Sequence, residues 1–318
     1  LGAKYRNAKV DAGVVQPLAY SVDRQKTIEG VKSFLARRDE ILQTEISWLA
    51  QVGADCVLAD APFLPCAAAS AYGIPACLIT NFTFDEVYRF LREGDTLDKD
   101  VMAVADAALE DYKKASLLLR LPGSIDIPSF EDEILAMETS RDSSLSMTAA
   151  SPMASKVRSL TRKVVDVPLV VRMAVNTRED VLRSLGVDEL TIATKKMVLV
   201  SFGGQRLKQG WGNPLPEGWI GVICGLPVEH ELPEGFYRSP HGVYVPDLTR
   251  AADIVIGKLG YGTCSECIAH DTPLIYVSRP QFVEEHGLIK MMINHGLPVE
   301  MTAEEFENGQ WQRSILEA

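Results

Sequence analysis

The sequence predicts an α/β protein with two Rossmann-like domains, each built on a parallel sheet. The chain has 318 residues, a length that suits two domains. Short apolar runs alternate with helical patterns in both halves, and the pattern changes near residue 170. Because apolar strands that alternate with helices are typical of parallel sheets covered on both faces, we expect domains at 1–170 and 171–318, with their sheets facing a cleft.

In the first half, the spacing of apolar residues predicts one long helix at 28–51. Apolar runs predict strands at 55–60, 74–80 and 116–122, and further helices are expected at 62–72, 83–91 and 98–114. Residues 139–160 are rich in Ser, Ala and Met without periodicity, which indicates a flexible surface insertion. Residues 164–172 are interpreted as a strand or a linker.

The second half has the same rhythm. Strands are predicted at 195–202, 219–225, 242–245, 252–257 and 273–278, and helices at 177–186, 247–251, 262–270 and 284–295. Alternation of this kind is typical of a nucleotide-binding domain in which ligands bind at the carboxyl ends of the strands.

Composition limits the partners. The net charge is −11, from 32 basic and 43 acidic residues, which disfavours nucleic acid and anionic membranes. No apolar run approaches the roughly 18 residues that a membrane span needs. No signal peptide is recognised, and most of the six cysteines lie within apolar runs, which favours buried thiols in a reducing compartment. We therefore expect a cytoplasmic protein. The opening residues resemble the interior of a fold, so we expect the protein to extend upstream of Leu1.

Cys264 and Cys267 form a CxxC motif, with His270 one turn later. A zinc site would need a second pair, so packing is the favoured interpretation and a metal or redox site the weaker one. We therefore expect no metal and no cofactor.

Two strand ends that run into glycines carry the functional prediction. They are SFGGQ at 201–205 and GKLGYGTCSE at 257–266. Glycines let the backbone approach a phosphate, and a following helix offers unpaired N–H groups and the positive end of its dipole. In the second segment Lys258 can pair with a phosphate. Thr263 and Glu266 fit a capping box, S/T-x-x-E, while the alternative is that Glu266 binds a ribose diol.

The segment ADIVIGKLGYGTCSECIAHDTPLIYV resembles the donor-binding region of GT-B glycosyltransferases, such as MurG-like enzymes and UDP-glycosyltransferases. Nearly the whole chain resembles the glycosyltransferase-like N-terminal half of L-arabinokinases, through motifs that include ITNFTFDEVY, DVPLVVR, SFGGQ and RPQFVEE in the same order.

This resemblance implies a nucleotide-sugar site in the second domain. Gly203 and Gly204 correspond to a first phosphate-side loop, and Gly260, Gly262 and Thr263 to the diphosphate loop. Lys258 replaces a phosphate-contacting His, Glu266 matches a ribose-binding Glu, and Glu284 and Glu285 fall near an acid–amide pair that contacts the sugar. From the residues alone, the acidic pair also fits an ordinary helix N-terminus.

In the first domain the resemblance assigns two residues. Asp60 corresponds to an Asp that orients a catalytic His, although an N-cap for the next helix is an alternative. Asn81 is a plausible acceptor-side contact, and a turn residue is the alternative.

Two departures from the family pattern bear on activity. All five histidines lie in the second half, so no His is available to Asp60, and the family's first strand and Gly/His-rich loop have no counterpart. The sugar-kinase half of L-arabinokinases and any Walker-type loop are also missing from the sequence.

Three hypotheses follow. The first is transfer of a sugar from a nucleotide donor to an unknown small-molecule acceptor. The second is a non-catalytic nucleotide-sugar-binding module that regulates a sugar kinase, and the third is a decayed homologue. The sequence identifies neither the sugar, the base nor the acceptor, and it gives no oligomeric state.

Overall fold

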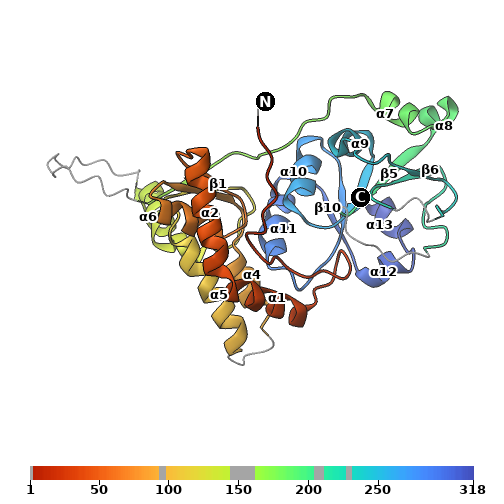
Figure 1. Ribbon diagram of the computed structural model, residues 1–318. Helices are drawn as coiled ribbons and strands as arrows, with labels where there is room; N and C mark the ends of the chain where they lie inside the picture. Colours follow the sequence, from red (N-terminus) through yellow and green to blue (C-terminus); the bar gives the residue numbers. More distant parts are fainter. Residues whose placement is uncertain (1–2, 93–97, 144–161, 204–210, 227–230) are drawn as a thin grey trace. The chain divides into compact units, whose positions relative to one another are not determined.

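The computed structural model describes residues 3–92, 98–143, 162–203, 211–226 and 231–318. The chain forms two compact units (Figure 1). The first comprises Leu1–Val15 and Arg24–Pro168, and the second comprises Gln16–Asp23 and Leu169–Ala318. Each unit contains one sheet whose strand pairs are all parallel, and this confirms the predicted α/β class.

The first unit has a four-stranded sheet in the order β1-β2-β3-β4. Its strands are β1 (Val57–Ala59), β2 (Ala76–Thr80), β3 (Leu117–Arg120) and β4 (Lys163–Asp166). Because neighbouring strands are parallel, their carboxyl ends share one edge, where residues such as Asp60 and Asn81 follow β1 and β2.

Helices and one 3₁₀ turn complete this unit. They are α1 (Arg24–Ala36), α2 (Arg38–Val52), α3 (Leu64–Tyr72), α4 (Phe84–Phe90), α5 (Lys99–Tyr112), η1 (Pro128–Phe130) and α6 (Glu131–Ser143). Prediction of a single helix at 28–51 was wrong, because Arg37 leaves helical geometry (φ −107°, ψ 5°) and separates α1 from α2. The core includes Phe34, Phe63 and Tyr112, whose rings meet edge to face.

The predicted flexible insertion at 139–160 falls only partly within the described residues. Residues 139–143 complete α6, so this part is helical and not irregular. Residues 144–160 lie outside the described residues.

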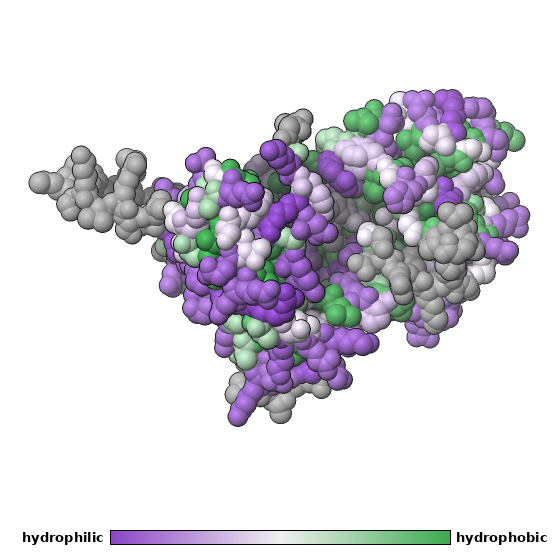
Figure 2. Space-filling view, viewed as in Figure 1, coloured by the Kyte–Doolittle hydropathy of each residue, from purple (hydrophilic) through white to green (hydrophobic). Residues whose placement is uncertain are grey.

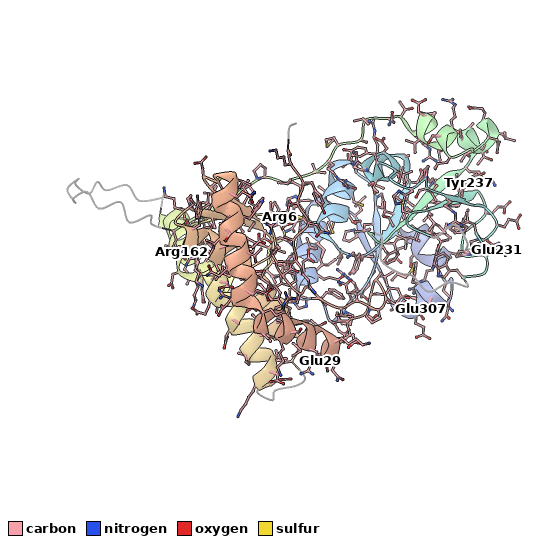
Figure 3. The ribbon with its side chains drawn as sticks, in the orientation of Figure 1. Arg6, Glu29, Arg162, Glu231, Tyr237 and Glu307 are labelled. Atoms are coloured by element: carbon pink, nitrogen blue, oxygen red, sulfur yellow. The ribbon has the colours of Figure 1, made fainter. Side chains whose placement is uncertain are left out.

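The segment that precedes α1 is anchored on α2. The guanidinium of Arg6, which is labelled in Figure 3, donates to both carboxylate oxygens of Glu45, at 2.7 and 2.6 Å. It also lies 4.6 Å from the centre of the Trp48 ring. The face of this unit seen in Figure 2 is mostly hydrophilic, in keeping with the many charged residues in the sequences of α1 and α2.

The second unit has a six-stranded sheet in the order β10-β9-β8-β5-β6-β7. Its strands are β5 (Lys196–Ser201), β6 (Trp219–Ile223), β7 (Phe236–Arg238), β8 (Ile254–Gly257), β9 (Leu274–Val277) and β10 (Pro298–Met301). The chain thus starts at β5, builds outward to β7, and returns to the other side of β5 with β8. This is the doubly wound order of nucleotide-binding domains, and its switch point lies between β5 and β8.

The helices of this unit are α7 (Arg178–Ser184), α8 (Glu189–Thr194), α9 (Val245–Ala251), α10 (Tyr261–Ala269), α11 (Glu284–His295), α12 (Ala303–Glu307) and α13 (Gln312–Glu317). The strand predicted at 242–245 was wrong. Gly242 turns the chain with φ +76°, and Pro246 occupies the first turn of α9. The third strand is instead β7, a short edge strand paired only through Phe236–Arg238.

The short segment Gln16–Asp23 belongs to the second unit, although it precedes α1 in the chain. Tyr20 packs edge-on against Phe202 and Phe306, with ring centroids 6.5 and 6.1 Å apart. Its hydroxyl donates to Glu307 at 2.7 Å, at the end of α12 (Figure 3). In the part of the chain that the structure describes, no helix is long and apolar enough to cross a membrane.

Candidate functional site

The candidate site lies at the carboxyl ends of β5 and β8, the switch point of the second sheet. These strands pair in parallel, with Ser201 opposite Gly257. A Cβ added to Gly257 would lie 2.5 Å from the carbonyl oxygen of Ser201, so the two strands approach more closely here than any side chain allows. Both strand ends therefore open into the same small region, as a ligand at a switch point requires.

Lys258 lies at the centre of this region. Its Cε is 3.8 Å from the position that a Cβ would take on Gly203, and 3.8 Å from that on Gly260. The structure thus brings together the lysine and one glycine from each predicted loop. Burial lowers the pKa of the Lys258 ammonium, the charge of Arg279 lowers it further, and Glu284 and Glu285 oppose this. An anion beside the ammonium would restore its preference for the charged form.

Gly204, predicted to belong to the same phosphate-side loop, lies outside the described residues. Gly203 is described and takes φ +64°, a conformation that favours glycine.

Neither the backbone conformation nor the neighbouring described atoms require glycine at positions 260 and 262, at the start of α10. Gly260 has an extended backbone (φ −134°) that any residue can adopt, and Gly262 does not have positive φ. Among the described residues, no heavy atom lies within 4 Å of the position of a Gly262 Cβ. As far as the described residues go, the space beside Gly262 is therefore open, and the unpaired N–H groups of this turn can be approached closely.

Thr263 and Glu266 do not form the capping box that their spacing allowed. The helix begins at Tyr261, its N-cap is Gly260, and no side chain caps it. Thr263 is the third helical residue, so the box is out of register. The carboxylate of Glu266 is instead almost fully buried, at 3% exposure, and accepts two hydrogen bonds from Arg172.

Glu284 and Glu285 open α11 and differ in environment. Glu285 is buried and accepts from the backbone N of Arg279 at 3.0 Å and from its Nε. Arg279 is only 2% exposed and also donates to the carbonyl of Leu259. Both oxygens of Glu285 are thus used within the protein. Glu284 is half-buried and its charge acts on Lys258.

Asp60 and Asn81, the predicted residues of the first unit, follow adjacent strands. Asp60 is not an N-cap, because α3 begins at Leu64 with Phe63 as its cap. Burial raises the pKa of the Asp60 carboxyl group, and no hydrogen bond to it is found within the described residues. Asn81 is 3% exposed, and its backbone carbonyl accepts a hydrogen bond from the backbone N–H of Ile125 at 3.0 Å.

A buried carboxyl group four residues after Asn81 was not predicted from the sequence. Asp85 is fully buried, and neither of its oxygens has a hydrogen-bond partner within the described residues. The hydroxyl groups of Thr83 and Tyr88 are also buried without a hydrogen-bond partner among the described residues. The Arg89 guanidinium lies 3.8 Å from the Asp85 carboxylate. Burial raises the pKa of Asp85 to about 6. Its position between aromatic residues in FTFDEVY was the available signal.

The CxxC motif is packed inside the second core. Cys264 and Cys267 are buried, and burial raises the pKa of Cys264 to about 12 and that of Cys267 well above its usual value. Such thiols stay protonated and unreactive. No group of His, Cys, Asp and Glu suited to a metal ion occurs among the described residues.

The chain is similar to known proteins in both sequence and structure. The chain is 33% identical over 314 residues to L-arabinokinase from Arabidopsis thaliana, covering 97% of this chain and 26% of that protein. The chain therefore spans about a quarter of the length of this relative. No family model matches. The crystal structure of CalG4, the calicheamicin glycosyltransferase, superposes with a TM-score of 0.55 at 15% identity, over 92% of this chain and 72% of that one.

The chain has the GT-B fold. Within this GT-B fold, the region around Lys258, Gly260 and Glu266 lies at the switch point of the second sheet. The predicted resemblance to GT-B glycosyltransferases and to L-arabinokinase is thereby confirmed.

Proposed function

We propose that the second unit binds a nucleotide-sugar donor and that the protein transfers the sugar to a small-molecule acceptor. One observation carries the proposal. The Lys258 side chain lies close to both Gly203 and Gly260 at the switch point, and the buried carboxylate of Glu266 lies on α10, which begins directly after Gly260. A cation with open backbone N–H groups suits a diphosphate, and a fixed carboxylate suits a sugar diol.

The diphosphate would bind along the first turn of α10, at Gly260, Gly262 and Thr263. We include Gly204 in the proposed diphosphate site because it follows Gly203 in the sequence. The ammonium of Lys258 would neutralise charge as the diphosphate leaves, which is the largest electrostatic demand of sugar transfer. No metal or cofactor has a role in this proposal.

The remaining donor contacts are carboxylates. Glu266 would accept the ribose hydroxyls, and Glu284 would accept hydroxyls of the transferred sugar. Glu285 has less support as a sugar contact, because Arg279 already uses both of its oxygens.

In the transfer step, an acceptor hydroxyl oxygen forms a bond to the anomeric carbon while the bond from that carbon to the diphosphate oxygen breaks. The hydroxyl proton passes to a carboxylate, for which we propose Asp60, with Asn81 as an acceptor contact. Burial raises the pKa of the Asp60 carboxyl group, the direction that makes a carboxylate a stronger base. We place the reaction in the cytoplasm, because all six cysteines are free thiols and such thiols suit a reducing compartment.

Thermal shift against UDP-, GDP- and ADP-sugars tests donor binding. A ligand at a hundred times its Kd stabilises the folded state by about 2.7 kcal/mol, so one of these series should raise the melting temperature. Lys258→Gln should abolish the shift, and Lys290→Gln, which changes an exposed lysine of α11, should preserve it. Failure of all three series would overturn the proposal.

Turnover is tested separately from binding. Release of free nucleoside diphosphate, dependent on an acceptor and lost in Asp60→Asn, would support transfer. Binding without turnover for any acceptor would favour the regulatory module related to a sugar kinase.

A further inference from the structure

Arg172 contacts Glu266 in an asymmetric way. Its Nε and one terminal nitrogen donate to the same oxygen, Oε1, at 3.0 and 2.6 Å. The Glu266 side chain is 4% exposed, while that of Arg172 is 61% exposed. Among the described residues no hydrogen bond reaches Oε2, so this oxygen keeps its full capacity to accept. The ion pair therefore occupies one half of the carboxylate and leaves the other half available.

The backbone on both sides of Arg172 is fixed to the second unit. The N–H of Val170 donates to the hydroxyl of Tyr261 at 3.1 Å, and the N–H of Ala174 donates to Nε2 of His270 at 3.0 Å. Further along, the carboxylate of Asp247 accepts from the N–H groups of residues 175 and 176 at 2.7 and 3.1 Å. Hydrogen bonds of the flanking backbone thus hold Arg172 in place beside Glu266.

This arrangement has a physical reason. A buried carboxylate without a partner is costly, and a single cation that hydrogen-bonds it offsets this cost. A carboxylate offers about four acceptor sites, of which Arg172 uses those on one oxygen. With the side chain held in one orientation by Arg172, the carboxylate keeps Oε2 for another hydrogen-bond donor.

We infer that Arg172 is a positioning residue of the donor site, holding the Glu266 carboxylate so that Oε2 accepts a ribose hydroxyl. The inference rests on the proposed function. It makes segment 169–176 a part of the donor site. It also assigns Arg172 and Glu266 to the ribose, whereas Lys258 is assigned to the diphosphate.

The test compares ribonucleotides with nucleotides that lack the diol. UDP, GDP and ADP are titrated calorimetrically into the parent chain, and the 2′,3′-dideoxy form of whichever binds is titrated beside it. Arg172→Gln should weaken binding of the ribonucleotide by roughly tenfold, the loss of one charge-assisted hydrogen bond. Binding of the dideoxy form should change by less than about twofold, because it makes no such bond.

Matched variants complete the design. Arg183→Gln removes an exposed arginine that pairs with Glu189 in the same unit, and it should bind both ligands as the parent does. Arg172→Lys should restore part of the affinity for the ribonucleotide, since an ammonium keeps the charge but not the paired N–H groups. Melting curves of each variant report folding, and Arg172→Lys serves for the comparison where Arg172→Gln does not fold.

The outcomes are separable. Equal losses for the ribonucleotide and the dideoxy form would show that Arg172 contacts another part of the nucleotide, and unchanged or tighter binding in Arg172→Gln would show that it does not position Glu266. Either result overturns the inference while leaving donor binding intact. A parent chain that binds none of the three nucleotides overturns the proposed function and the inference with it.

Discussion

Arg279 and Glu285 form a buried ion pair behind the candidate site. The backbone N–H of Arg279 donates to one carboxylate oxygen at 3.0 Å and its Nε donates to the other. The guanidinium also lies 4.0 Å from the centre of the Phe282 ring. The pair connects the segment after β9 to the first turn of α11. It therefore fixes the positions of Arg279, Glu284 and Glu285, whose charges act on Lys258.

Glu285→Ala should strongly destabilise the second unit. It leaves a guanidinium of 2% exposure without its carboxylate, and breaking a buried pair in this way costs about 3–5 kcal/mol. Urea unfolding measures the loss. Glu189→Ala, which removes only an exposed pair with Arg183, should unfold close to the parent. A loss below about 1 kcal/mol in Glu285→Ala would contradict the structural role assigned to this pair.

Asp85→Asn should change how stability depends on pH. Burial raises the pKa of Asp85 from 3.8 to about 6, so the protonated carboxyl group is the form that stabilises the fold. That contribution is complete below pH 3.8 and is lost as the pH rises through about 6. Asn is neutral throughout, so between pH 4 and 8 the parent should lose roughly 2 kcal/mol relative to the variant.

Denaturant unfolding of both proteins at several pH values checks this. Asp55→Asn, at an exposed position, should run parallel to the parent. A difference between parent and Asp85→Asn that stays constant with pH would show that Asp85 is ionised at little cost.

The strands of the second unit were predictable because they are buried on both faces. In β5 every residue after Lys196 is buried, and the sequence MVLVS carries this pattern without ambiguity. The edge strand β7 has only Phe236–Arg238 and one partner, so its sequence resembles a loop, while the apolar run at 242–245 misled the prediction. Arg37 gives no breaking signal, which is why α1 and α2 were merged.

The site was predictable where a buried strand runs directly into glycines. Lys258 and Gly260 follow β8 directly, and the strand–glycine–helix pattern marks them. Arg172 is 94 residues from Glu266, and no local pattern connects the two. The capping box failed for a related reason, because a box depends on where the helix starts, and α10 starts two residues before Thr263.

Gly257→Ala should destabilise the second sheet at the switch point. The new Cβ would lie 2.5 Å from the carbonyl oxygen of Ser201, a backbone atom that moves only if β5 and β8 separate. Overpacking of this kind costs about 1–3 kcal/mol. Thermal and urea unfolding measure it. Gly30→Ala in α1, where no described heavy atom lies within 4 Å, is the control and should not destabilise.

Gly262→Ala should separate stability from binding. Within the described residues nothing obstructs a Cβ at this second position of α10, and replacing a helical glycine by alanine gains about 0.5–1 kcal/mol. If the diphosphate approaches the backbone here, the added methyl group occupies its space. We therefore expect a higher melting temperature together with nucleotide-sugar affinity reduced by about tenfold or more. Gly30→Ala should show a comparable gain in stability with unchanged affinity. A Gly262→Ala protein that is more stable and binds as tightly as the parent would remove the first turn of α10 from the donor site, and would leave Lys258 and Glu266 to be explained by the packing of the second unit alone.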